Sequence, residues 1–186
     1  ILALASVCIL ASAGSGQSRR LRFTINDGWQ FTGTDLSGGE KAGIDTSGWQ
    51  QVNLPHTWNI ADTLDDEPGY RRGVSWYRKR LNLDRGLAGK RIFLYFEGVN
   101  QTADVYVNEK PVGSHIGGYS AFVFDITRLV DFTGPNTIAV KVDNSLVNDI
   151  PPLDADFNMH GGIYRDAWII ATNDVHIKAT GMASSG

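Results

Sequence analysis

The chain has 186 residues, which is enough for one domain with a hydrophobic core and too few for two large domains. Hydrophobic residues make up 42% of the chain and charged residues 20%, as is typical of folded rather than disordered proteins. The net charge of −3 leaves no broad basic surface of the kind that binds nucleic acid. A (β/α)₈ barrel needs roughly 250 residues, so this chain is too short to contain one.

The first 13 residues carry no charge and end in Ala11-Ser12-Ala13, a pattern typical of a signal peptidase site. We therefore predict that residues 1–13 are a signal peptide with an incomplete start, and that the protein is exported to the periplasm or secreted. The alternative for this stretch is a buried strand or helix. It is too short to span a bilayer comfortably, and we predict no membrane span. Cys8, the only cysteine, lies inside it, so the mature chain would have no disulfide.

The region from residue 19 to residue 180 has the pattern of short strands separated by Gly-rich turns, with no sustained 3.6-residue periodicity. The run 92–96 is apolar on both faces and is predicted to be a central strand, and residues 108–111 are predicted to form a tight hairpin. The predicted strands are residues 29–34, 50–54, 75–83, 91–97, 103–108, 111–116, 121–126, 137–143, 164–171 and 175–179.

Strands at this spacing, without helices between them, predict an all-β fold that is an antiparallel β-sandwich. The folded domain would span residues 19–180. Residues 181–186 are small and polar, and we predict that they are a linker toward further domains.

The sequence contains no motif of a metal site, a cofactor site or a catalytic site. No two of the four histidines are three to five residues apart, so a zinc site is not predicted. There is neither a phosphate-binding loop nor a nucleophile elbow. Nothing marks any two of the four glutamates as the carboxylate pair that glycoside hydrolysis needs. The acidic loop at residues 65–67 could bind a hard cation, and a solvated loop is the alternative. We predict no cofactor, no metal and no catalytic residue in this chain.

Three stretches of the sequence carry a specific resemblance to a known family. They are residues 49–59 followed by 73–79, residues 96–127, and residues 154–166, which read Asp-x-x-x-x-x-Gly-Ile-x-Arg from Asp156 to Arg165. Together they resemble the N-terminal sugar-binding domain of glycoside hydrolase family 2, the family of β-galactosidases, β-glucuronidases and β-mannosidases. The resemblance covers nearly all of residues 21–179. It implies a jelly-roll sandwich of the galactose-binding type, which in this family precedes an immunoglobulin-like domain and a catalytic barrel.

The resemblance also implies which residues contact the sugar. Matching the family's motif places its sugar-contacting aspartate at Asp156, and the asparagine that often follows Pro-His-x-Trp points to Asn59. An ionised aspartate can accept hydrogen bonds from two adjacent sugar hydroxyls, and an asparagine adds both a donor and an acceptor. Asn158 and His160 lie on the same segment as Asp156 and are further candidates. A role in stabilising the loop is the alternative for Asp156.

Two residues depart from the usual pattern of the family. Glu109 stands in the hairpin where glycine is usual, and Arg71 stands where an aromatic residue is common. For Arg165, which lies beside Asp166 and has other acidic residues available, we expect an ion pair rather than a catalytic role.

We therefore expect this chain to be the N-terminal carbohydrate-binding domain of an exported family 2 glycoside hydrolase resembling β-galactosidase. It would help to form the subsite for a terminal β-linked sugar, and it would be inactive without the catalytic barrel. The expected partners are a carbohydrate and the downstream immunoglobulin-like and barrel domains of the same chain, with no nucleic acid. The alternatives are a self-standing carbohydrate-binding module without catalysis and a purely structural domain.

Overall fold

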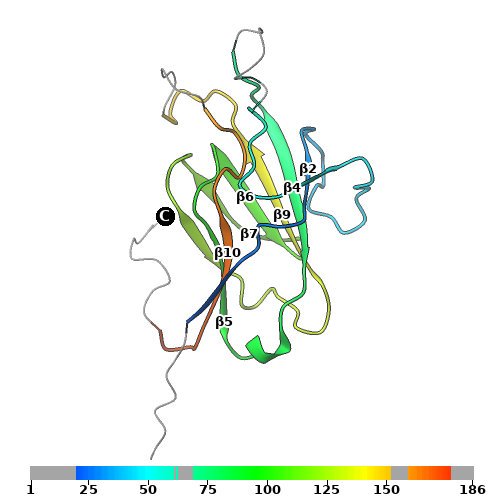
Figure 1. Ribbon diagram of the computed structural model, residues 1–186, viewed down its shortest axis with the longest axis vertical. Coiled ribbons are helices and arrows are strands. Elements are labelled where there is room, and N and C mark those ends of the chain that lie inside the picture. Colours follow the sequence, from blue (N-terminus) through cyan, green and yellow to red (C-terminus); the bar gives the residue numbers. More distant parts are fainter. Residues whose placement is uncertain (1–19, 61, 63–68, 152–158, 177–186) are drawn as a thin grey trace, which may run out of the picture.

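The computed structural model describes residues 20–60, 62, 69–151 and 159–176, and these form two antiparallel sheets that pack as a β-sandwich (Figure 1). The four-stranded sheet consists, in spatial order, of β1 (Leu21–Thr24), β10 (Ala167–Thr172), β5 (Arg91–Phe96) and β8 (Phe122–Asp125). The six-stranded sheet consists of β3 (Gln50–Val52), β2 (Trp29–Thr32), β4 (Val74–Leu81), β9 (Asn136–Asp143), β6 (Thr102–Val107) and β7 (Lys110–Ile116). A 3₁₀ turn, η2 (Arg85–Leu87), follows β4.

The main core lies between the two sheets. It consists of every second side chain of the strands, since successive side chains point to opposite faces of a sheet. In β5, Ile92, Leu94 and Phe96 are fully buried, whereas the intervening residues of the strand are half-buried. This strand lies between β10 and β8, so the prediction of a central strand is confirmed. The antiparallel β-sandwich is confirmed as well, and the finer jelly-roll topology stays a prediction.

A second, smaller hydrophobic cluster lies on the outer face of the six-stranded sheet. Trp49, Trp76 and Ala139 are its buried members, and the half-buried side chains of Leu36 and Ile44 pack against them. These residues show that the segment between β2 and β3 folds back over the sheet. Because of this cover, β9 is buried at Ala139 as well as on its core-facing side.

The predicted hairpin is confirmed between β6 and β7. Its two turn residues, Asn108 and Glu109, have φ angles of 50° and 66°, the left-handed values that two-residue hairpin turns require. Glycine adopts such angles without a steric penalty, which explains why Glu109 is unusual there. The Glu109 carboxylate compensates by accepting a hydrogen bond from the backbone N–H of Ala42.

Three differences from the predicted strands have simple causes. Strand β1 is not among the predicted strands. Its four residues alternate apolar and polar side chains, but the run is short and all four side chains are exposed. The strand predicted from residue 164 begins at Ala167. Val175 and His176 form no strand, and the rest of the predicted strand 175–179 lies outside the described residues.

The predicted signal peptide (residues 1–13) and the predicted linker (residues 181–186) also lie outside the described residues. Within the described part, no helix has the length and apolar character needed to cross a membrane.

Candidate functional site

The candidate sugar site lies at one end of the six-stranded sheet. Because β4 and β9 are antiparallel and pair Val74 with Asp143, the chain entering β4 and the chain leaving β9 meet at this end. Asn144, which follows β9, accepts a hydrogen bond from the backbone N–H of Gly73 (2.8 Å). The segments around Asn59 and Gly161 join them there through side-chain hydrogen bonds, so four segments distant in sequence come together.

Asn59 is the centre of this arrangement, and its exposed fraction is only 1%. Its side-chain Nδ2 donates to a carboxylate oxygen of Asp62 and to the carbonyl oxygen of Arg71 (3.0 Å), and its Oδ1 accepts from the backbone N–H of Gly161 (2.6 Å). Asn59 therefore fixes the position of the loop that carries the other candidates. Its direct contact with a sugar stays a prediction.

Arg71 ties the same segments together through its main chain and its side chain. Its carbonyl oxygen accepts hydrogen bonds from Trp58 Nε1 (3.2 Å), Asn59 Nδ2 (3.0 Å) and Asn144 Nδ2 (3.1 Å). Its guanidinium carbon lies 5.1 Å from the centre of the Trp58 ring, within the range of a cation–π contact. A planar guanidinium that stacks on an aromatic ring thus explains how Arg71 can stand where the family commonly has an aromatic residue.

The two glycines at positions 161 and 162 are required by close packing. A Cβ on Gly161 would lie 2.5 Å from the Trp58 ring and from Asn144 Nδ2. Gly162 has a φ of +112°, and a Cβ there would lie 2.5 Å from the Tyr77 hydroxyl oxygen. Gly162 also exchanges two backbone hydrogen bonds, both 3.0 Å, with Asn100. These contacts hold the chain just after the candidate sugar-binding segment in a single position.

A cluster of aromatic rings, which includes Trp58 and Tyr77, packs against the two glycines. The rings of Phe31 and Trp58 are stacked with centroids 5.9 Å apart, and Nδ1 of His56 lies 2.7 Å from the Tyr77 hydroxyl oxygen. Burial lowers the pKa of His56 and raises the pKa of Tyr77. Both groups are therefore neutral at pH 7. The cluster thus forms an uncharged, closely packed support for the site.

The remaining predicted site residues are placed as follows. His160 is exposed, next to the buried Met159. Asp156 and Asn158 lie outside the described residues, so their contact with a sugar stays a prediction. Sequence reasoning missed Arg72, whose Nη2 lies 3.6 Å from Met159 Sδ and whose Nη1 donates to the carbonyl oxygen of Asn144 (3.4 Å).

The ion pair expected for Arg165 is absent from the described part of the chain. Arg165 is exposed, and its guanidinium carbon lies 5.6 Å from the centre of the Tyr164 ring. Asp166 instead accepts a hydrogen bond from Asn26 Nδ2 (3.0 Å). The cause is local: the ring of the preceding residue is available to the guanidinium, and Asp166 is already engaged.

No group of three or more His, Cys, Asp or Glu side chains suited to a metal ion occurs among the residues that the structure describes. The acidic loop at residues 65–67 is outside this range.

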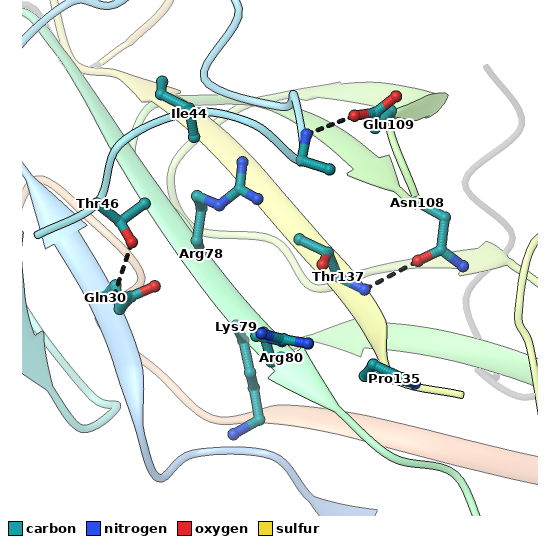
Figure 2. A pocket seen from close by; sticks show the side chains of 11 residues that line it. Gln30, Ile44, Thr46, Arg78, Lys79, Arg80, Asn108, Glu109, Pro135 and Thr137 are labelled. Carbon is teal, nitrogen blue, oxygen red and sulfur yellow. Dashed lines mark hydrogen bonds between the residues drawn. The ribbon is translucent and has the colours of Figure 1, made fainter. Parts of the chain in front are cut away.

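A pocket of about 520 Å³ lies elsewhere, on the outer face of the six-stranded sheet. Figure 2 shows Arg78 and Arg80 on β4, Thr137 on β9, and Glu109 at the turn between β6 and β7. None of the residues that surround Asn59 lines this pocket. Its members come from several separate segments, so no motif in the sequence signals it.

Comparisons with known proteins agree with the sequence resemblance. Residues 37–173 match the family model described as "Glycosyl hydrolases family 2, sugar binding domain". A β-glucuronidase of Bacteroides fragilis is 40% identical over 169 residues, which cover 91% of this chain and 23% of the relative. A β-galactosidase of Thermoanaerobacter pseudethanolicus is 41% identical over 162 residues, which cover 85% of this chain and 21% of the relative.

The solved structures show the same similarity in three dimensions. The crystal structure of a Bacteroides uniformis β-glucuronidase superimposes with a TM-score of 0.79 at 42% identity, over 84% of this chain and 18% of the other. The chain thus spans about a fifth of the length of such relatives. The family model matches most of the chain, and the solved structures share its β-sandwich. The chain therefore belongs to the sugar-binding domain family of the family 2 glycosyl hydrolases.

Proposed function

We propose that this chain is the N-terminal carbohydrate-binding domain of a longer, exported family 2 glycoside hydrolase that removes terminal β-linked glucuronic acid or galactose. The family match over residues 37–173 carries this proposal. The relatives above are named as a β-glucuronidase and a β-galactosidase, which supports both sugars. Export rests on the uncharged segment 1–13 and its Ala11-Ser12-Ala13 end.

In this proposal the domain positions sugar-contacting groups and the rest of the enzyme performs the chemistry. Asp156 offers a carboxylate that accepts hydrogen bonds from two neighbouring hydroxyls of the terminal sugar. The hydrogen bond between Asn59 and Gly161 and the close packing of Gly162 support it, because they fix the chain five and six residues beyond Asp156. Asn158 and His160 would add polar contacts to the same subsite.

The reaction itself needs a general acid and a second carboxylate on either side of the glycosidic bond. In this proposal, the downstream barrel provides both groups, and an immunoglobulin-like domain lies between it and this chain. The 186-residue chain would then bind sugar weakly and hydrolyse nothing by itself.

The test replaces Asp156 in the full-length enzyme by Asn and by Ala. Loss of a charged hydrogen bond of about 1.5–3 kcal/mol lowers kcat/KM for an aryl β-glucuronide or β-galactoside by roughly 10- to 150-fold. The matched control is Asp174→Asn, since Asp174 is exposed and lies after β10. Unchanged kinetics in both Asp156 variants would overturn the sugar contact and leave a structural domain. Binding at millimolar or tighter affinity by the chain alone would favour a self-standing module instead, if galactose binds or if glucuronate shifts the signals of Asn59, His160 and Gly161.

A further inference from the structure

The pocket on the outer face of the six-stranded sheet is separate from the sugar site. Trp76, Arg78 and Arg80 alternate along β4 and share its outer face, whereas Ser75 and Tyr77 point the other way. A strand rises about 3.3 Å per residue, so Arg80 lies roughly 20 Å along β4 from the end that forms the sugar site. Any ligand in this pocket would therefore be distinct from one held near Asp156.

Arg78 is a buried cation on the wall of the pocket, with an exposed fraction of 6%. Its Nη1 donates to the carbonyl oxygens of Gly39 (2.6 Å) and Lys41 (2.8 Å), which lie in the segment that covers the sheet. No carboxylate within the described residues forms an ion pair with it. Burial lowers its pKa, while the more distant charges of Glu109 and Glu40 oppose this. The guanidinium charge is thus offset by carbonyl dipoles and by the charges of Glu109 and Glu40, but neither carboxylate forms an ion pair with it among the described residues, and buried charges are usually paired.

Arg80, on the same strand face, places a second cation in the lining of the pocket, and this residue is exposed (Figure 2). Its side chain makes no hydrogen bond or ion pair within the part of the chain that is described. Two residues apart on one strand face, the Cβ atoms of Arg78 and Arg80 are about 7 Å apart. Because the Arg80 side chain is exposed and unbonded within the described residues, it can turn toward an anion that is bound beside Arg78.

Neutral polar groups complete the lining. Thr137 on β9 lies beside Arg78 and Arg80, and Thr46 accepts a hydrogen bond from Gln30 Nε2 (3.1 Å) through its hydroxyl oxygen. The Thr46 hydroxyl can donate its own proton to a ligand. None of the lining residues is aromatic, so the pocket offers no platform for the apolar face of a sugar ring.

Two further charged residues, Glu109 and Lys79, line the pocket. Glu109 is an anion, but its carboxylate is engaged by the backbone N–H of Ala42. Lys79 lines the pocket too, but its Nζ donates to the carbonyl oxygen of Asp27 and lies 6.0 Å from the centre of the Trp29 ring. The two arginines thus outweigh the one carboxylate.

From this arrangement we propose that the pocket binds a small oxyanion, either a carboxylate or a sulfate-type group, between Arg78 and Arg80. The anion would supply the counter-charge that Arg78 lacks and would accept hydrogen bonds from Arg80 and from the threonine hydroxyls. A free inorganic anion and the acidic group of a uronate sugar present the same chemistry.

The experiment is a titration of the ¹⁵N-labelled 186-residue chain at constant ionic strength with sodium sulfate, sodium glucuronate and neutral galactose in separate arms. We expect the backbone signals of residues 78–80 and 137 to shift with a millimolar dissociation constant in at least one anionic arm and not with galactose. Arg80→Ala is expected to weaken binding about fivefold, because an exposed charge contributes modestly. Glu109→Gln, which removes the local negative charge, is expected to tighten it. Arg128→Ala is the control, since Arg128 is exposed and follows β8 of the other sheet.

The results distinguish a free inorganic anion from the acidic group of a uronate sugar, and they can also contradict the proposal. Shifts with glucuronate alone assign the pocket to the carboxylate of a uronate sugar, and shifts with both anions assign it to small oxyanions in general. The proposal is overturned if neither anion moves these signals, or if Arg80→Ala and Arg128→Ala change the affinity equally. Arg80 is exposed, so its variant should fold, and its spectrum checks this directly. The test does not involve Asp156 and is independent of the proposed hydrolase function.

Discussion

Asn59 Oδ1 accepts a hydrogen bond from the backbone N–H of Gly161 at 2.6 Å, across 102 residues of sequence. This single contact connects the loop after β3 to the chain five residues beyond Asp156, the predicted sugar-binding aspartate. The same amide also donates to the carbonyl oxygen of Arg71, the residue that precedes β4 by three positions. The buried asparagine therefore links three loops at the end of the sandwich.

Replacing Asn59 by alanine should destabilise the domain. The backbone N–H of Gly161 would lose its buried partner, whereas the carbonyl oxygen of Arg71 would keep its bonds from Trp58 and Asn144. An unsatisfied buried N–H costs about 1–3 kcal/mol in the free energy of unfolding. Urea denaturation followed by tryptophan fluorescence measures this change. The control is Asn82→Ala at an exposed position, for which we expect a change within about 0.5 kcal/mol. Equal stability of the two variants would contradict the linking role of Asn59.

Gly162→Ala tests whether the packing beneath the loop is as tight as the geometry indicates. The φ of +112° disfavours alanine, and the added Cβ would clash with the Tyr77 hydroxyl and the His56 carbonyl oxygen. We expect the free energy of unfolding to fall by at least about 2 kcal/mol. The matched control is Gly48→Ala, because no atom lies within 4 Å of the Cβ that would be added there. Equal melting temperatures for these two variants would be incompatible with the close approach at Gly162.

Acidification should destabilise the domain through two half-buried histidines, His56 and His115. Burial lowers the pKa of His56 and of His115 in the folded state, whereas both have a pKa of about 6.5 in the unfolded chain. The unfolded chain therefore binds protons first, and the free energy of unfolding declines as the pH falls below about 6.5. Above that pH these histidines contribute no pH dependence.

Thermal unfolding between pH 7.5 and pH 5.5 measures this effect. The melting temperature should fall toward pH 5.5, and His56→Asn should reduce the slope because one of the two groups is then absent. NMR titration of the His56 ring protons gives its folded-state pKa directly. A value at or above 6.5 would be inconsistent with this explanation.

The main core should tolerate truncation far less than the surface does. Leu94 is fully buried in the central strand β5, and its replacement by alanine should cost about 2–5 kcal/mol, the range for a buried leucine that leaves a cavity. Leu146, with an exposed fraction of 56%, is the matched control and should change stability by less than about 0.5 kcal/mol. Chemical denaturation of both variants provides the comparison. Similar losses would mean that β5 is not central to the fold.

Much of the fold could be predicted because strand burial repeats every two residues. The alternation of β9, the apolar run of β5 and the Asn-containing hairpin turn are local signals, and the structure confirms each of them. Strand β1 has only four residues that alternate apolar and polar, and they are not buried, because the strand pairs with β10 at the edge of its sheet and its side chains stay exposed. Its position depends on backbone hydrogen bonds to a strand almost 150 residues later, which no local pattern encodes.

The candidate site, too, could be predicted only in part from the sequence. The sequence motif identified the segment containing Asp156 and His160, but the network around Asn59 and Arg71 depends on contacts between loops that are far apart in the chain. The pair Arg78 and Arg80 looks in the sequence like the polar side of an ordinary strand. Only folding of the β2–β3 segment over β4 converts one of them into a buried cation.

By itself, then, the amino-acid sequence determined the strands, the hairpin and the family, because these follow from side-chain periodicity, turn chemistry and ordered motifs. The tertiary structure alone decided which polar side chains are buried as loop supports and which line a pocket. The physical reason is that burial and hydrogen-bond partners are properties of assembled segments, and those segments meet only when the two sheets and their covering loops are in place.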